Sequence, residues 1–145
     1  MKGVIKAISI SEKKGTQKQN VEQAILKDGY GIMGDAHAGC GHRQVSLLAE
    51  ESIEKMRLKG LKVKEGDFAE NITTQGINLL SLKIGDKLKI GETALLEVSQ
   101  MGKVCHARCN IFYQAGDCIM PREGIFARVL KGGIVKIGDR LEVID

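Results

Sequence analysis

A cluster of cysteine and basic residues in the C-terminal half of the sequence could carry out thiol chemistry. Three of the four cysteines fall within fourteen positions: Cys105, Cys109 and Cys118. Cys105 is flanked within three positions by Lys103, His106 and Arg108. A free thiol has a pKa of about 8.5, and nearby cations stabilise its nucleophilic thiolate form. The spacing predicts a reactive thiol at Cys105; the alternative is a buried, inert cysteine, and the flanking charges argue against deep burial.

A glycine-rich segment supplies a second group of polar residues. Five of the thirteen residues from Gly29 to Gly41 are glycine, and Asp35, His37 and Arg43 lie in this segment or directly after it. Consecutive backbone amides in such a loop can bind an anion, and an arginine can bind phosphate through two parallel hydrogen bonds. The segment thus predicts an anion site. The alternative is a tight turn in which Asp35 accepts local backbone hydrogen bonds and His37 is a packed polar residue.

Zinc binding is a further hypothesis, because histidine and cysteine are typical zinc ligands. The available residues are His37, Cys40, His42, Cys105, His106, Cys109 and Cys118. The last three cysteines are separated by three and eight residues, which matches no paired Cys-x2-Cys pattern. We therefore predict no metal site. A third segment, at 116–124, places Arg122 near Cys118, and Pro121 within it predicts a loop.

The elements that must position these residues are mostly short strands. Aliphatic and β-branched runs predict strands at 3–10, 21–26, 44–48, 79–80, 83–90, 93–99, 125–130 and 136–143, and a turn at 66–72 that leads into another strand. A helix is predicted over 50–59, with Ile53 and Met56 on its apolar face and Gly60 just beyond its end. Many glycines, short strands and little helix predict a mainly β fold, a partly closed β-barrel with a few short helices, in a single domain spanning residues 1–145.

Two stretches of this sequence echo each other. Residues 83–90 read KIGDKLKI and residues 136–143 read KIGDRLEV, so each begins with a Gly-Asp turn and continues as an alternation of polar and apolar residues. Such alternation is typical of strands in a sheet with one buried face. We expect both stretches to be turns that enter strands.

Composition excludes several classes of function. Twenty-two Lys and Arg against eighteen Asp and Glu give a net charge of only +4, and five aromatic residues are too few for a base-stacking platform, so no nucleic-acid partner is expected. No long apolar run occurs, so we expect no membrane partner and a cytoplasmic protein. Phosphate-binding Gly-x4-Gly-Lys-Ser/Thr, His-Glu-x2-His and Gly-x-Ser-x-Gly motifs are also absent.

The order of the motifs resembles the MOSC domain, which is found at the C-terminus of molybdenum-cofactor sulfurases and as free-standing bacterial proteins. The resemblance covers nearly the whole chain. It rests on GDAHAG at 34–39 followed by RQVSLL at 43–48, on GDFAENI at 66–72, on IGD at 84–86 and on KVCH at 103–106.

This resemblance implies a barrel like the β-barrel domain of pyruvate kinase and a site that handles sulfur for the molybdenum cofactor (molybdopterin). In the family a cysteine is proposed to receive sulfane sulfur as a persulfide, and the matching position is Cys105. The residues implied in cofactor binding, through the pterin phosphate or by shaping the pocket, are Asp35, His37, Arg43, Lys103, His106, Arg108 and Arg122.

The resemblance also implies partners. The sulfur donor would be a cysteine desulfurase and the acceptor a molybdoenzyme or a cofactor-biosynthesis protein. No intrinsic pyridoxal phosphate is expected, because 145 residues are too few to include the desulfurase domain of the full sulfurases. Two other functions stay open: a non-catalytic module that binds metal or cofactor, and a molybdenum-dependent reductase of N-hydroxylated compounds.

Overall fold

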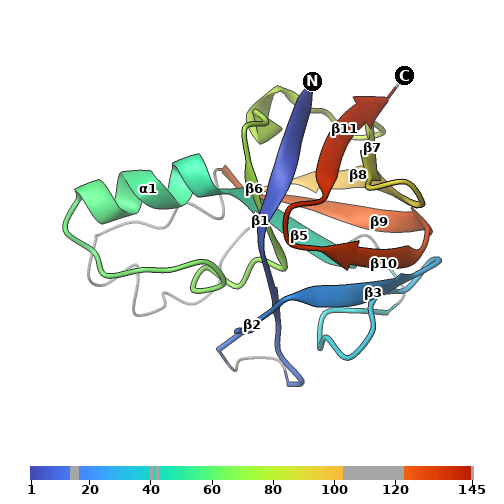
Figure 1. The fold of residues 1–145 in the computed structure, drawn as a ribbon, viewed down its shortest axis with the longest axis horizontal. Coiled ribbons are helices and arrows are strands. Elements are labelled where there is room, and N and C mark those ends of the chain that lie inside the picture. The colour runs from blue at the N-terminus through green and yellow to red at the C-terminus, as the bar shows by residue number, and fades with distance from the viewer. Residues whose placement is uncertain (14–16, 40, 42, 103–122, 145) are drawn as a thin grey trace.

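The computed structural model describes residues 1–13, 17–39, 41, 43–102 and 123–144. Its elements are, in chain order, β1 (Lys2–Ile10), β2 (Gln19–Val21), β3 (Gln23–Lys27), β4 (Gly31–Ile32), β5 (Val45–Ala49), α1 (Glu50–Leu58), β6 (Ile72–Gln75), the 3-10 helix η1 (Leu79–Ser81), β7 (Lys87–Ile90), β8 (Ala94–Met101), β9 (Ile125–Lys131), β10 (Gly133–Lys136) and β11 (Arg140–Ile144). Both chain ends lie at the same end of the molecule (Figure 1).

Seven of the described strands close into a barrel. They follow the order β11, β7, β8, β9, β5, β6 and β1, and hydrogen bonds between β1 and β11 complete the ring. Strand β2 extends this sheet by pairing with the last residues of β1. The ring is mixed, because β5 and β6 are parallel whereas the other neighbours are antiparallel. The predicted mainly β barrel is confirmed.

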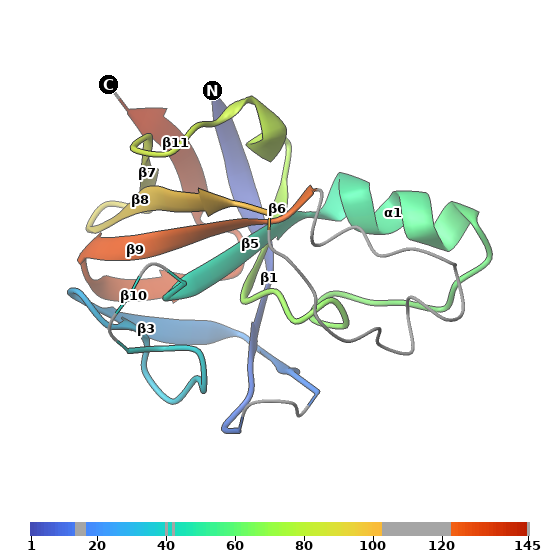
Figure 2. The same ribbon diagram turned by 180° about the vertical axis from the view of Figure 1, so that it is seen from behind.

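The parallel pair explains the position of α1. Parallel neighbours require a crossover connection, and α1 begins directly where β5 ends (Figure 2). The predicted apolar face is confirmed, because Ile53 and Met56 are buried against Leu48, Phe68 and Phe126. Acidic residues in its first turn and basic residues in its last turn complement the helix dipole. No helix in the described ranges combines the length and apolar character that a membrane crossing requires.

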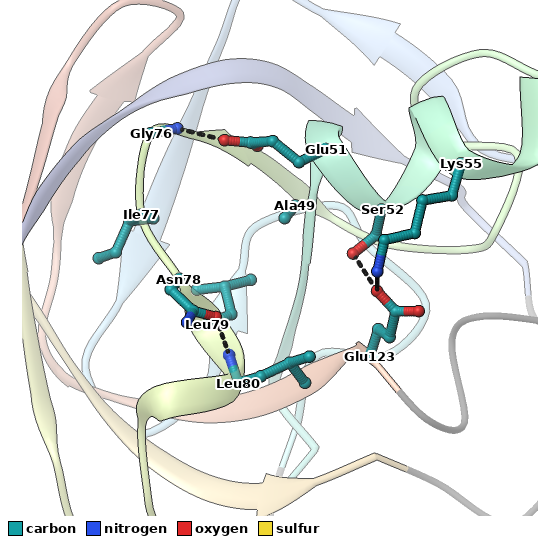
Figure 3. A pocket seen from close by; sticks show the side chains of 10 residues that line it. All are labelled: Ala49, Glu51, Ser52, Lys55, Gly76, Ile77, Asn78, Leu79, Leu80 and Glu123. Atoms are coloured by element: carbon teal, nitrogen blue, oxygen red, sulfur yellow. Dashed lines mark hydrogen bonds and ion pairs between the residues drawn. The ribbon is translucent and has the colours of Figure 1, made fainter. Parts of the chain in front are cut away.

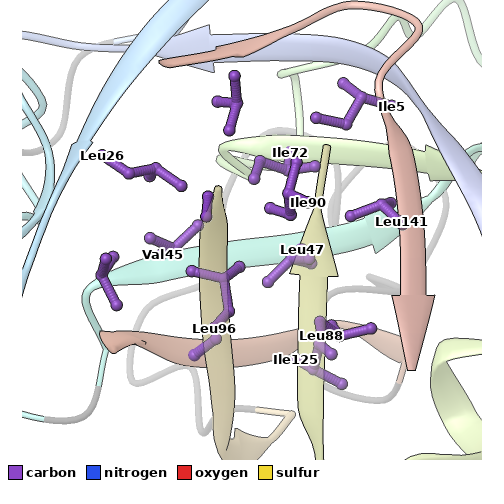
Figure 4. Packing of buried hydrophobic residues seen from close by; sticks show 14 of the residues in the cluster. Ile5, Leu26, Val45, Leu47, Ile72, Leu88, Ile90, Leu96, Ile125 and Leu141 are labelled. Atoms are coloured by element: carbon purple, nitrogen blue, oxygen red, sulfur yellow. The ribbon is translucent and has the colours of Figure 1, made fainter. Parts of the chain in front are cut away.

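The barrel interior is filled by aliphatic side chains that alternate with outward-facing residues along each strand. Side chains from all seven barrel strands and from β3 meet there (Figure 4). The labelled residues are Ile5, Leu26, Val45, Leu47, Ile72, Leu88, Ile90, Leu96, Ile125 and Leu141. Each Å² of apolar surface buried here stabilises the folded state by about 25 cal/mol. The filled interior therefore gives the loops at the barrel ends a stable support.

The two echoing stretches are confirmed as equivalent turns that enter neighbouring strands. Asp86 accepts a hydrogen bond from the backbone N–H of Lys83, and Asp139 accepts one from that of Lys136. The strands that follow, β7 and β11, pair with each other in antiparallel fashion. The repeat in the sequence therefore marks two equivalent barrel strands.

Two predicted strands differ from the structure. Leu79 and Leu80 lie in η1, because the side chain of Asn78 accepts a hydrogen bond from the N–H of Leu80 and so favours a turn. The strand predicted at 21–26 is divided between β2 and β3 at Glu22, whose carbonyl oxygen accepts a hydrogen bond from Ile137. In both cases a hydrogen bond outside the regular ladder interrupts the strand.

The glycine-rich segment contains a short strand that the sequence did not predict. Gly31 and Ile32 form β4, which joins β3 and β10 in a small second sheet. Gly31 has φ +125°, and a Cβ there would lie 2.8 Å from the carbonyl oxygen of Gln44. Glycine is therefore required at this position by a close backbone approach as well as by its conformation.

Candidate functional site

Asp35 lies in the loop that follows β4, and its carboxylate is buried. Its Oδ1 accepts a hydrogen bond from the backbone N–H of Ser11 at 3.0 Å, and its Oδ2 accepts one from the N–H of His37 at 3.2 Å. The second bond is the local turn contact that the sequence suggested. The first ties the loop to the end of β1, so Asp35 orders the loop that carries His37.

The sequence did not indicate Lys18, which proves to be the main partner of Asp35. Their side chains are 1% and 0% exposed, and Lys18 Nζ lies 2.8 Å from Asp35 Oδ1. Lys18 Nζ also donates to Ser11 Oγ at 3.3 Å and lies 3.1 Å from His37 Nδ1. A buried carboxylate requires a counter-charge, but nothing distinguishes Lys18 from the other basic residues of the sequence.

These neighbours keep Asp35 ionised. Burial alone would raise the pKa of Asp35, but the hydrogen bonds from Lys18 and from the backbone N–H of Ser11, together with the charge of Lys18, hold it well below its usual range. The His37 side chain, by contrast, remains 41% exposed. Asp35 therefore holds the loop from its buried side, and His37 is the member of this group that is exposed to solvent.

Arg43 is exposed but held in place by two contacts. Its Nε donates to Oε1 of Gln100 at 3.0 Å, and its guanidinium lies 5.3 Å from the ring centre of Phe126. Gln100 and Phe126 are directly paired in the β8–β9 ladder, and β9 also pairs with β5, which starts two residues after Arg43. Three adjacent barrel strands, seen side by side in Figure 2, thus orient a guanidinium whose terminal nitrogens make no hydrogen bond to the described residues.

Gln44 fixes the glycine-rich segment to the same strands. Its Nε2 donates to the carbonyl oxygens of Gly29 and Gly41 at 3.0 and 3.2 Å, and its Oε1 accepts from the N–H of Val129 at 2.9 Å. One buried side chain therefore connects both ends of the segment to β9. Gln44 thus holds the glycine-rich segment beside its neighbour Arg43, and anion binding by this segment stays a prediction.

The thiol half of the predicted site lies outside the described residues. That half comprises Lys103, Cys105, His106, Arg108 and Arg122. The remaining candidate ligands Cys40, His42, Cys109 and Cys118 also lie outside the described residues. The described chain does fix where the segment starts and ends. The N–H of Gly102 donates to the carbonyl oxygen of Gly124 at 2.7 Å, and Gln100 Nε2 donates to the carbonyl oxygen of Gly102 at 2.6 Å. Gln100 therefore contacts both Arg43 and the residue from which the cysteine segment departs.

The GDFAENI motif at 66–72 is a structural support. Asn71 Oδ1 accepts from the N–H and the hydroxyl of Ser46, at 3.0 and 3.1 Å, and its Nδ2 donates to the carbonyl oxygen of Ser9 at 3.1 Å. Asn71 thus joins β1 to β5 through its side chain. Burial raises the pKa of the neighbouring Glu70, although hydrogen bonds from Gly66 and Thr73 lower it in part.

A separate pocket of about 320 Å³ lies between the start of α1 and the segment after β6 (Figure 3). Glu123 Oε1 accepts hydrogen bonds there from Ser52 and Lys55, at 2.7 and 3.0 Å. None of the described predicted residues, Asp35, His37 and Arg43, lines it. Within the described ranges, no three His, Cys, Asp or Glu side chains are grouped so as to hold a metal ion.

Comparison with known folds agrees with the barrel. YuaD of Bacillus subtilis superposes with a TM-score of 0.82 over 99% of this chain and 96% of its own, at 20% identity. YiiM of Geobacillus stearothermophilus gives a TM-score of 0.73 over 99% of this chain and 75% of its own, at 19% identity. YiiM of Escherichia coli gives 0.68 over 100% and 70%, at 21% identity. These likenesses show a shared fold.

Sequence comparison adds two findings. A protein of Gibberella moniliformis named "Reductase" is 26% identical over 141 residues, which cover 88% of this chain and 25% of that protein. The chain therefore spans about a quarter of the length of this relative. The family model for the MOSC domain matches residues 34–142, from the glycine-rich loop to the last barrel strand. The chain belongs to the MOSC domain family.

Proposed function

We propose that this MOSC domain is a cytoplasmic sulfur carrier that binds the molybdenum cofactor as its sulfur acceptor. Cys105 receives sulfane sulfur from a cysteine desulfurase, and the loop side chains bind the phosphate end of the cofactor. Gln100 carries this proposal, because it holds Arg43 and also Gly102, the last described residue before the cysteine segment. Three residues of chain span at most about 11 Å, so the covalent path from Gly102 limits how far Cys105 can lie from this contact.

The described residues suit an oxyanion. A guanidinium held by its Nε and by an aromatic face keeps its terminal N–H groups for a two-point contact with phosphate. Such a contact is directional and requires little ordering on binding, because Gln100 and Phe126 already fix the side chain. His37, on the loop anchored by Asp35, supplies a further polar group at the exposed side.

The transfer to Cys105 follows thiol–disulfide exchange chemistry. The Cys105 thiolate attacks the terminal sulfur of a persulfide on the desulfurase, the donor S–S bond breaks, and the donor cysteine leaves as a thiolate. Release of that sulfur as sulfide needs two electrons. A second thiolate supplies them when it attacks Sγ of Cys105 and forms a disulfide; Cys109 and Cys118 are the candidates for this role.

Mass spectrometry tests the sulfur-carrier role directly. After incubation with a cysteine desulfurase and cysteine, the wild-type protein should gain about 32 Da, one sulfur atom, and lose it on reduction. Cys105→Ala should gain none, whereas Cys40→Ala, which removes a cysteine outside the cluster, should behave as wild type. Equal labelling of Cys105→Ala would refute the assignment.

The name of the Gibberella relative favours a second candidate, a reductase in which the molybdenum cofactor is retained and supplies the redox centre. The same Arg43 contact would then hold the resident cofactor. Protein reconstituted with the cofactor should in that case reduce an N-hydroxylated substrate, and Arg43→Ala should lower cofactor content after gel filtration. A reconstituted protein that retains cofactor but shows no turnover would favour the carrier role.

A further inference from the structure

Lys18 uses all of its hydrogen-bonding capacity inside the protein. A lysine ammonium has three N–H donors and no acceptor. Three acceptors surround Nζ: Asp35 Oδ1 at 2.8 Å, His37 Nδ1 at 3.1 Å and Ser11 Oγ at 3.3 Å. The Lys18 side chain is 1% exposed, so water cannot replace these partners. Two of the three acceptors belong to the predicted loop, and one of them is a ring nitrogen of the exposed histidine.

From this geometry we propose that Lys18 is a positioning residue that fixes the tautomer of His37. Because the ammonium can only donate, Nδ1 of His37 must accept, and the single proton of the neutral ring lies on Nε2. A proton on Nδ1 would face the ammonium at 3.1 Å, whereas Oδ2 of Asp35 is 3.8 Å away, beyond hydrogen-bond distance. The ring is therefore held with Nε2–H as its free donor.

This assignment gives His37 a defined role toward an oxyanion, and it rests on the proposed anion site. Where a carboxylate accepts the Nδ1 proton of a histidine, it raises the basicity of the ring and favours a cation or a general base. Here an ammonium occupies that position, and its charge is balanced by Asp35. His37 consequently acts as an oriented Nε2–H donor, and Arg43 supplies the positive charge at the ligand.

The tautomer can be observed by nitrogen-15 NMR of the imidazole rings at neutral pH, with the His37 signals assigned by their loss in His37→Gln. The wild type should show a protonated Nε2 and an unprotonated Nδ1. A wild-type ring protonated on Nδ1, or on both nitrogens, would overturn the proposal. This readout is independent of sulfur transfer, so the carrier function can fail while the assignment stands.

Two variants test whether Lys18 imposes the tautomer. Lys18→Met removes the donor, and Lys18→Met/Asp35→Asn removes it without leaving a buried charge, in case the single variant does not fold. Either folded variant should lose the fixed Nε2–H form and bind inorganic phosphate about fivefold more weakly, the effect of one hydrogen bond. Lys6→Met, at an exposed position of β1, should match the wild type. A folded variant that keeps both the tautomer and the phosphate affinity would show that Lys18 has no such role.

Discussion

Removal of the Lys18 ammonium should destabilise the fold far more than loss of a surface ion pair. In Lys18→Met, Asp35 keeps its bonds from the N–H groups of Ser11 and His37 but loses its only buried counter-charge within the described residues. Leaving one member of a buried pair uncompensated costs about 3 to 5 kcal/mol. Domains of this kind are stable by about 5 to 15 kcal/mol in total, so Lys18→Met should approach the limit of folding.

Urea unfolding of a double-mutant cycle measures this effect. Lys18→Met/Asp35→Asn should recover part of the loss, with a coupling energy of about 2 to 3 kcal/mol, because no isolated charge stays buried. Lys6→Met, an exposed control on β1, should lie within about 0.5 kcal/mol of the wild type. Exposed ion pairs contribute less than about 1 kcal/mol to the free energy of unfolding. A loss that small in Lys18→Met would refute the reasoning from a buried pair.

The same pair predicts the sign of an acid effect. The folded-state pKa of Asp35 is lowered, so its contribution to stability is complete above the ordinary value of 3.8 and is lost as the pH falls below it. Asp35→Asn should therefore remove part of the loss of stability in acid, as measured by urea midpoints from pH 6 down to pH 3. An unchanged slope would mean that Asp35 ionises equally in the folded and unfolded chain.

Three further predictions concern residues near the same loops. Burial raises the pKa of Glu70 above 4.5, so above pH 4.5 its carboxyl in the folded protein keeps a proton that the unfolded chain releases. The free energy of unfolding therefore falls as the pH rises above 4.5. Because glutamine stays neutral, Glu70→Gln should raise the urea midpoint at pH 8 more than at pH 4. Ala69 has φ +66°, so Ala69→Gly should relieve strain and raise stability by up to about 1 kcal/mol in thermal unfolding. Arg43→Lys should weaken inorganic phosphate binding about tenfold in calorimetry, because lysine lacks the two-point contact of the guanidinium. Gln100→Leu should weaken it about threefold, because the guanidinium stays but loses the hydrogen bond that orients it. A phosphate affinity equal to that of the wild type in both variants would contradict the proposed anion contact.

The barrel was predictable because strand signals in this sequence are local. Alternating residues and Gly-Asp turns follow from the two-residue repeat of a strand and from the turn chemistry of aspartate. The helix at 50–58 could be predicted for the same reason, since its apolar face and Gly60 are encoded within one segment. Closure of the ring was harder to foresee in detail, because β1 pairs with β11 across almost the whole length of the chain.

The candidate site was predictable only where the sequence concentrates its chemistry in one stretch. Asp35, His37 and Arg43 stand close together among glycines. The structure anchors Asp35 and His37 in one loop and holds the glycine-rich segment through Gln44, while the binding role of these residues stays a prediction. Lys18 and Gln100 could not be found in this way, because their roles depend on contacts with residues 17 and 57 positions away. Side chains that support a loop from another strand carry no local signature.

The position of these supporting residues has a consequence for how the site works. Gln100 lies near the end of β8, Phe126 near the start of β9 and Arg43 just before β5, and these strands are consecutive in the barrel. The cysteine segment leaves β8 and returns to β9 at the hydrogen-bonded pair of Gly102 and Gly124. The guanidinium is thus fixed by the same two strands that anchor the segment carrying Cys105. If sulfur transfer requires the phosphate contact and the thiol to keep a constant relation, the β8–β9 ladder is the described element that maintains it.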